Sequence, residues 1–224
     1  MADAQVRNAA TIIVVRDTAA GPAILMGQRG AKAAFMPGKF VFPGGAVDTN
    51  DALAPTTQLP EICATRLSHH SDIAPQMIAA AAIRELWEET GQILGAGGQW
   101  DAPPADWAGF AAAGHIPNAA ALTYFFRAVT PTGAPRRFDA RFFLARADDL
   151  SSNPDDFADA QDELSHLQWV PLMRARDFDL PFITQVVLAE LMAHLPRRDA
   201  PDSVPFFAND DELHMVARLG GSAI

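Results

Sequence analysis

The stretch Arg84-Glu85-Leu86-Trp87-Glu88-Glu89-Thr90-Gly91 decides the fold of this chain. In a helix its three glutamates fall on one face, because residues three and four apart are neighbours on a helix surface. Like charges at this spacing destabilise an isolated helix by about 0.2–0.5 kcal/mol. A hard divalent cation removes that repulsion, since Mg²⁺ and Mn²⁺ prefer carboxylate oxygens and water. The sequence therefore predicts a helix over residues 76–91 with an acidic ridge, namely Glu85, Glu88 and Glu89.

The surroundings of the acidic ridge favour a functional site over a solvated, glutamate-rich helix, which is the commoner explanation of such a pattern. Arg84 lies four residues before Glu88 and can pair with it. Gly91 stands where a C′ residue ends a helix. The turn Phe42-Pro43-Gly44-Gly45 follows a strand-like run, and glycine there lets the backbone approach an ion or a phosphate closely.

These residues resemble the Nudix box, whose pattern is G-x5-E-x7-R-E-U-x-E-E-x-G-U with U aliphatic. Residues 84–91 match its second half, and Gly45 followed by Asp51 fits its first half with Asp in place of Glu. An insertion at about residues 52–76 splits the box, and Gln92 stands at its last aliphatic position. With the flanking stretches FMPGKFVFPGGAVDTND and RRFDARFFLA, the chain resembles the acyl-CoA diphosphatase branch of the Nudix hydrolases.

The order of the predicted elements indicates an α+β fold in which a mixed sheet lies between helical layers. Apolar runs bounded by turn residues predict strands at residues 11–16, 23–28, 40–42, 122–129, 138–145 and 166–170. An amphipathic helix is predicted at residues 181–195 and a loop at residues 95–104. The resemblance implies the same architecture, the α/β/α Nudix sandwich. We expect one Nudix domain over residues 1–224, with a helical extension from about residue 181.

Composition and charge exclude several classes of protein. Of the 224 residues, 49% are hydrophobic and 20% are charged, which supports a folded core and argues against disorder. The formal net charge of −10 disfavours binding to nucleic acid or to an anionic membrane, and no apolar run is long enough to span a bilayer. The N-terminus shows no secretory signal, and the single cysteine, Cys63, fits a reducing compartment, so we expect a cytoplasmic protein.

The resemblance also implies roles for the site residues. The acidic ridge would hold Mg²⁺ or Mn²⁺ together with a backbone carbonyl of Gly44 or Gly45, and Arg84 would orient its carboxylates. The general base is open between Glu85, within the box, and Glu163, on a later loop. Glu163 can also serve as a distal metal ligand or be a solvated loop acid.

Substrate contacts are expected from cations near the glycine turn and from the strands after the box. Arg29, Lys32 and Lys39 lie close to the turn in the sequence, and Arg136 and Arg137 open the stretch RRFDARFFLA. These side chains either meet phosphates or are ordinary surface cations.

The function that follows is metal-dependent hydrolysis of a nucleoside diphosphate linked to another group. The branch resemblance points to CoA or acyl-CoA, cleaved to 3′,5′-ADP and (acyl-)phosphopantetheine. The alternatives are a pyrophosphatase for ADP-ribose, NADH or nucleotide sugars, and a non-catalytic Nudix module that binds a ligand. All three box glutamates are present, which favours the enzyme. The insertion leaves two roles open, covering the cleft or forming a homodimer contact.

Overall fold

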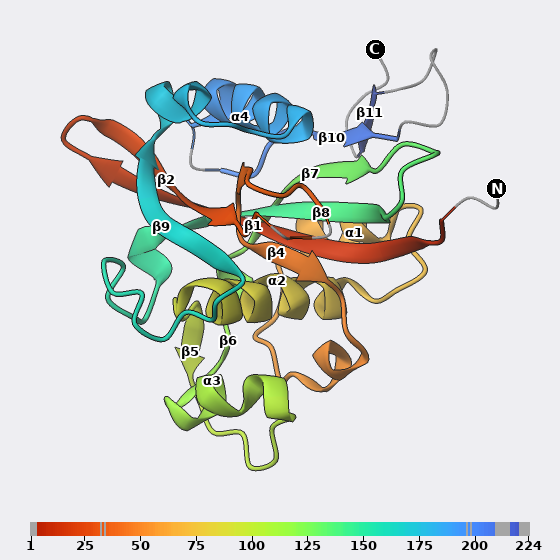
Figure 1. The fold of residues 1–224 in the computed structure, drawn as a ribbon. Helices are drawn as coiled ribbons and strands as arrows, with labels where there is room; N and C mark the ends of the chain where they lie inside the picture. The colour runs from red at the N-terminus through yellow and green to blue at the C-terminus, as the bar shows by residue number, and fades with distance from the viewer. Residues whose placement is uncertain are drawn as a thin grey trace.

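The computed structural model describes residues 4–31, 33, 35–195, 197, 199–208 and 216–219, and a mixed sheet crosses the middle of this part (Figure 1). Its strands are β1 (Val6–Thr18), β2 (Gly21–Arg29), β3 (Phe40–Val41), β4 (Gly44–Ala46), β7 (Thr123–Val129), β8 (Arg137–Arg146), β9 (Leu164–Pro171), β10 (Val204–Phe207) and β11 (Val216–Leu219). The strand order is β11-β10-β7-β8-β1-β2-β3, with β4 paired to β1 and β9 to β2. The predicted α+β architecture with a mixed sheet is confirmed.

The central strand β1 shows why the sheet has helices on both faces. Its side chains alternate between the faces. Ala10, Ile12 and Val14 belong to the core on one side, while Ile13 and Val15 belong to the core on the other. β1 pairs in parallel with β8 and antiparallel with β2. Because both of its faces are apolar, β1 has to be covered from both sides.

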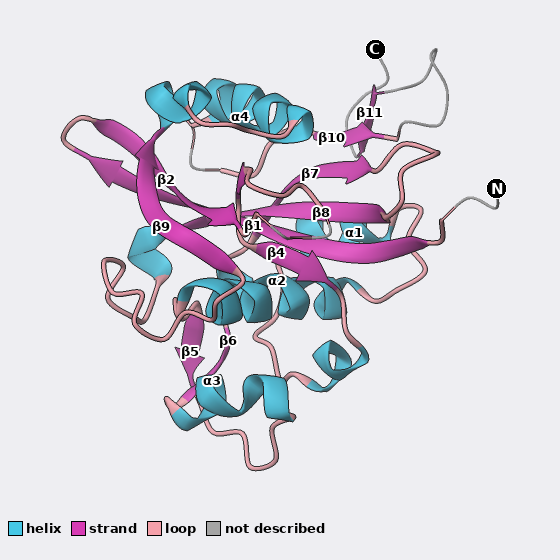
Figure 2. Cartoon of the chain, in the orientation of Figure 1, coloured by secondary structure: helices cyan, strands magenta, loops and turns pink. Residues whose placement is uncertain are grey.

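The helices form the two covering layers. α4 (Phe182–His194) lies on one face of the sheet, and α2 (Pro75–Thr90) and α3 (Ala108–Ala112) lie on the other (Figure 2). α1 (Glu61–Ser68) contributes Cys63 and Leu67 to the core on the α2 side. No helix in the described part of the chain has both the length and the apolar character needed to cross a membrane.

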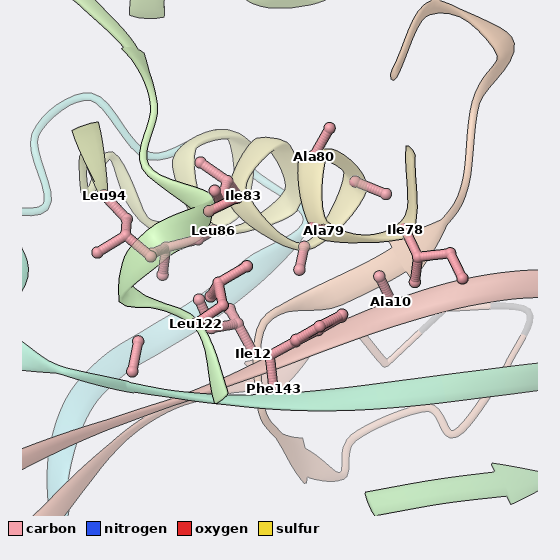
Figure 3. Close-up of a cluster of buried hydrophobic side chains, with 14 of the residues drawn as sticks. Ala10, Ile12, Ile78, Ala79, Ala80, Ile83, Leu86, Leu94, Leu122 and Phe143 are labelled. Carbon is pink, nitrogen blue, oxygen red and sulfur yellow. The ribbon is translucent and has the colours of Figure 1, made fainter. Parts of the chain in front are cut away.

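The larger core lies between the sheet and α2. Ile12 and Phe143 from the sheet share a buried cluster with Ile83 and Leu86 from α2 (Figure 3). This packing fixes the apolar side of α2 against the sheet, so the rotation of the helix about its axis is set. The position of the acidic ridge is set with it.

Local chemistry sets both ends of α2. Pro75 begins the helix at a position where a missing N–H costs nothing. Gly91 ends it with a φ of 71°, a left-handed conformation that favours glycine, and its N–H donates to the carbonyl of Trp87 at 2.8 Å. The predicted helix over residues 76–91 and its glycine stop are both confirmed.

Two segments differ from the sequence-based expectation. Residues 95–104, expected as a loop, begin with β5 (Gly95–Gly97), which pairs with β6 (His115–Pro117). The sequence of β5 is Gly-Ala-Gly, so it has no strand propensity of its own and depends on its partner. The extension from about residue 181 begins with α4 as expected but continues as β10 and β11, which widen the sheet beyond β7.

Residues 52–76, predicted to be an insertion, are attached to the sheet through Arg127 of β7. The guanidinium of Arg127 donates to the backbone carbonyls of His69 and His70, at 2.7 Å in each case. It also makes a bidentate pair with Asp139 of β8. The chain therefore approaches the start of α2 while held against the sheet at His69 and His70.

Candidate active site

β4 brings the glycine turn directly against the acidic ridge. The backbone N–H of Gly44 donates to Glu89 Oε2 at 2.8 Å. A Cβ atom on Gly45 would overlap the carboxylate of Glu85, so a larger residue there would push that carboxylate aside. The close backbone approach predicted for the turn is therefore present, and the groups it approaches are carboxylates of α2.

Arg84 gathers two of the three ridge carboxylates. Its Nη1 donates to Glu85 Oε1 at 2.9 Å and to Glu88 Oε2 at 2.7 Å. Its Nη2 donates to the carbonyl of Ala46 at 3.0 Å. The predicted pairing of Arg84 with Glu88 is confirmed, and the buried guanidinium also ties α2 to β4.

Asp51 is bonded to Arg84 of α2, which lies 33 residues later in the sequence. Both of its carboxylate oxygens accept from Arg84, at 2.8 Å from Nε and 3.1 Å from Nη2. One of them also accepts from the backbone N–H of Asp48 at 2.8 Å, at the start of a short 3-10 helix, Thr49–Leu53. Asp51 is buried, and its carboxylate holds Arg84 in place.

The positive charge of Arg84 does not fully offset the burial of the ridge carboxylates. Burial raises the pKa of Glu85 to about 7, although the charge of Arg84 and its hydrogen bond oppose the shift. Burial also raises the pKa of Glu88 and raises that of Glu89 well above its ordinary value, where the charge of Glu85 adds to the effect. Glu89 Oε1 is buried and has no hydrogen-bond partner. A cation would stabilise carboxylates in this condition.

Glu163 and Arg29 stand as a pair beside the ridge. Arg29 Nη2 donates to Glu163 Oε1 at 2.9 Å. The charge of Glu163 raises the pKa of Glu85 and of Glu89, so it lies within electrostatic reach of both. The Glu163 side chain is 58% exposed, which leaves it accessible to an incoming molecule. Arg29, expected at a phosphate, is paired with Glu163 here, and its contact with substrate stays a prediction.

The other predicted substrate cations are not gathered at the ridge. Lys39 Nζ pairs with Asp179 at 2.5 Å, at the segment that precedes α4. Arg137 lies four residues before Arg141 on β8, so it is about 13 Å along the sheet from the level of the glycine turn. Lys32 lies outside the described residues.

Arg137 lines a separate cationic cavity at the beginning of β1 and β8. The cavity has a volume of about 350 Å³, and its lining residues are Ala4, Gln5, Arg7, Pro135, Arg136, Arg137 and Phe138. None of these residues is acidic, in a chain whose formal net charge is −10. Three of the lining residues, Arg7, Arg136 and Arg137, are basic, and the register of β1 with β8 directs the side chains of Arg7 and Arg137 to opposite faces of the sheet.

The residues of the ridge suit a hard divalent cation by their chemistry. Within the part of the chain that the structure describes, no three His, Cys, Asp or Glu side chains already converge on one point as metal ligands. Glu85 and Glu88 instead direct their carboxylates at Arg84. Glu89 offers a buried oxygen without a partner, and the backbone of Gly45 lies against Glu85. Oxygen donors of this kind are those that Mg²⁺ and Mn²⁺ prefer.

One acidic residue near the ridge has no signal in the sequence. The charge of Asp106 raises the pKa of Glu88. Asp106 belongs to a short 3-10 helix, Ala105–Trp107, and accepts a hydrogen bond from Asn50 Nδ2 at 3.4 Å. It reaches the ridge only because the segment between β5 and β6 folds back beside α2.

Comparison with known proteins agrees with this geometry, although no family model matches the chain. The solved structure of a NUDIX hydrolase from Alicyclobacillus acidocaldarius is similar, with a TM-score of 0.62 and 29% identity, over 85% of this chain and 93% of that chain. The chain has the Nudix fold. The NUDIX domain of NrtR from Shewanella oneidensis, solved with ADP ribose, shares this fold with a TM-score of 0.51 and 11% identity, over 85% of this chain and 89% of that chain.

A Caenorhabditis elegans relative, described by name as a nudix hydrolase, is 33% identical over 157 residues. The match covers 64% of this chain and 45% of the relative, so the chain spans less than half of that relative's length. Together with the box and the Nudix fold, these similarities support a place in the Nudix hydrolase superfamily.

Proposed function

We propose that this chain is a hydrolase that uses Mg²⁺ or Mn²⁺ to break the diphosphate of a nucleoside diphosphate linked to another group. The observation that carries the proposal is the state of the acidic ridge. Its three carboxylates have raised pKa values, and Glu89 Oε1 is buried without a partner. A cluster of buried carboxylates destabilises the folded state unless a cation neutralises their charge.

The ligands of the cation would be Glu85, Glu88, Glu89 and the backbone carbonyl of Gly45. When bound, the cation neutralises phosphate oxygens and lowers the pKa of coordinated water. The chain supplies the rigid support. Arg84 fixes the carboxylates of Glu85 and Glu88, while the N–H of Gly44 fixes that of Glu89.

Glu163 is the general base in this proposal. Glu163 is accessible and has no direct bond to Arg84, and its charge acts on both Glu85 and Glu89, whereas that of Asp106, another exposed acid near the ridge, acts on Glu88. Glu85 is the alternative base, since its pKa of about 7 lies near the working pH that suits proton transfer. Glu85 is also a proposed metal ligand, and a cation would keep it ionised and engaged, so Glu163 suits the base better.

For the substrate we propose CoA or acyl-CoA, with 3′,5′-ADP and (acyl-)phosphopantetheine as products. CoA carries a 3′-phosphate besides its diphosphate, and the cationic cavity lined by Arg7, Arg136 and Arg137 offers that phosphate a second anchor. Arg7 lies three residues along β1 from Ala10, the partner of Gly45, which is about 10 Å. ADP-ribose, NADH and nucleotide sugars share the diphosphate and form the alternative substrate class. A non-catalytic ligand-binding module is the alternative outside enzymes.

The test is a turnover assay with CoA, acetyl-CoA, ADP-ribose, NADH and a UDP-sugar, in the presence of Mg²⁺ or Mn²⁺. Glu88→Gln is the matched control, because it removes a ridge charge at nearly constant volume. We expect the wild type to hydrolyse CoA best and Glu88→Gln to keep the fold but lose most turnover. Folded wild type that turns over none of the substrates, yet binds one of them by calorimetry, would establish the binding module instead.

A further inference from the structure

Gln92 is fully buried at a position where the Nudix box has an aliphatic residue. Both ends of its side-chain amide are hydrogen-bonded. Nε2 donates to the carbonyls of Asn153 and Asp156, at 3.2 and 2.6 Å, and Oε1 accepts from the hydroxyl of Ser152 at 2.8 Å. All three partners belong to residues 151–161, so this buried polar side chain has one evident task, which is to hold that segment.

The same segment wraps around the C-terminal end of α2. The N–H of Gln161 donates to the carbonyl of Glu88 at 2.8 Å, one of the last carbonyls that lack a partner within the helix. At its other end, the N–H of Ser151 donates to the carbonyl of Ile93 at 2.7 Å. Gly91 permits the approach, since a Cβ atom there would come within 3.1 Å of the Ala160 nitrogen. The segment is thus attached at both ends, with Gln92 between them.

Glu163 follows this segment directly. It lies two positions after Gln161, which is at most about 7 Å along the chain. Glu163 is therefore placed between two held points, Gln161 on α2 and Leu164, which pairs with Arg29 on β2. The Glu163 side chain is largely exposed and pairs with Arg29, so its position depends mainly on the backbone.

We propose that Gln92 is a positioning residue, which holds residues 151–163 on the end of α2 so that Glu163 faces the acidic ridge. The proposal rests on the proposed function, in which Glu163 receives the proton of the attacking water. An aliphatic residue at position 92 leaves the carbonyls of Asn153 and Asp156 without the Gln92 donor and removes the acceptor of the Ser152 hydroxyl. The middle of the segment then keeps the bond from Trp169 Nε1 to the carbonyl of Pro154 and the bond from the Ile93 N–H to Ser152 Oγ.

The main experiment is a double-mutant cycle of Gln92→Leu and Glu163→Gln, with kcat and KM measured for the best substrate. Gln92→Leu alone is expected to lower kcat about tenfold or more, because small misplacements of a reacting group are costly. It should change KM by less than about twofold. In the Glu163→Gln background the same substitution should have little further effect. Effects that simply multiply would show that Gln92 does not act through Glu163.

Two controls separate positioning from general loosening of the segment. Gln92→Glu keeps the size and the Ser152 contact but cannot donate to the two carbonyls, so it should behave as Gln92→Leu does. It also replaces Gln92→Leu in the double-mutant cycle should that variant fail to fold. Asp155→Asn weakens the exposed pair with Arg16 on the outer side of the segment and should leave kcat unchanged. A fall in kcat with Asp155→Asn equal to that with Gln92→Leu would contradict a special role for Gln92.

Hydrogen exchange tests the placement without any turnover. The Gln161 amide, bonded to Glu88, should lose protection in Gln92→Leu and Gln92→Glu while amides within β1 keep theirs. Unchanged protection at Gln161 would overturn the proposal. This readout stays valid should the wild type hydrolyse none of the substrates, an outcome that counts against the proposed function and not against the attachment.

Discussion

Replacing Glu85 with Gln tests whether the acidic ridge is a cluster of uncompensated charges. Burial raises the pKa of Glu85 from 4.5 to about 7, so the ionised form is disfavoured in the folded protein. The folded chain therefore holds this proton more tightly than the unfolded chain. The stability that the bound proton contributes is complete below about pH 4.5 and is lost as the pH rises through about 7.

The size of the expected stability difference follows from the pKa shift of Glu85. A change from 4.5 to about 7 corresponds to about 3 kcal/mol, at roughly 1.4 kcal/mol for each pKa unit. Gln carries no proton to lose and can still accept a hydrogen bond from Arg84. In EDTA at pH 8 we expect Glu85→Gln to be more stable than the wild type by up to about 3 kcal/mol. The difference should shrink toward zero as the pH falls to about 4.5.

Urea unfolding between pH 5 and pH 8, in EDTA and in Mn²⁺, measures this directly. Mn²⁺ should stabilise the wild type at pH 8 more than it stabilises Glu85→Gln, because a cation bound only by the folded state raises stability. Glu61→Gln, at an exposed acid on α1, serves as the control for the loss of one carboxylate far from the ridge in sequence. The reasoning fails should Glu85→Gln prove less stable than the wild type in EDTA at pH 8, or should the difference not vary with pH.

Three further outcomes are expected. Glu163→Gln should lower kcat and remove the acidic limb of the pH–kcat profile, and an unchanged profile would reduce Glu163 to an ordinary loop residue. Gly45→Ala should lower stability by about 1–3 kcal/mol, because its Cβ would displace the carboxylate of Glu85. It should also weaken Mn²⁺ binding measured by electron paramagnetic resonance, and normal Mn²⁺ affinity in the folded variant would contradict the site. Arg136→Ala should raise KM for CoA and not for ADP-ribose, and equal changes for both would remove the cationic cavity from the substrate site.

The acidic helix could be predicted from the sequence because its signals are local. The spacing of Glu85, Glu88 and Glu89, the pairing of Arg84 with Glu88 and the stop at Gly91 all act within one or two helical turns. The alternation of apolar residues gave the central strands for the same reason.

The rest of the site depends on contacts between residues far apart in the chain. Arg29 resembles a phosphate ligand in the sequence, yet it pairs with Glu163 at a separation of 134 residues. Asp106 reaches the ridge through a hairpin whose first strand has no strand propensity. In the sequence, Gln92 departs from the aliphatic residue of the motif. The hydrogen bonds of its side chain to Ser152, Asn153 and Asp156 show that it holds the segment of residues 151–161.

The contact between Asp51 and Arg84 joins the two parts of the box through space and not through a short spacer. This ion pair, and not the number of residues between Asp51 and Arg84, sets the distance between the two parts of the box. A search pattern with fixed spacing overlooks proteins built in this way. A three-dimensional template made of the Asp51, Arg84 and Glu88 side chains would recover such proteins whatever the size of the insert.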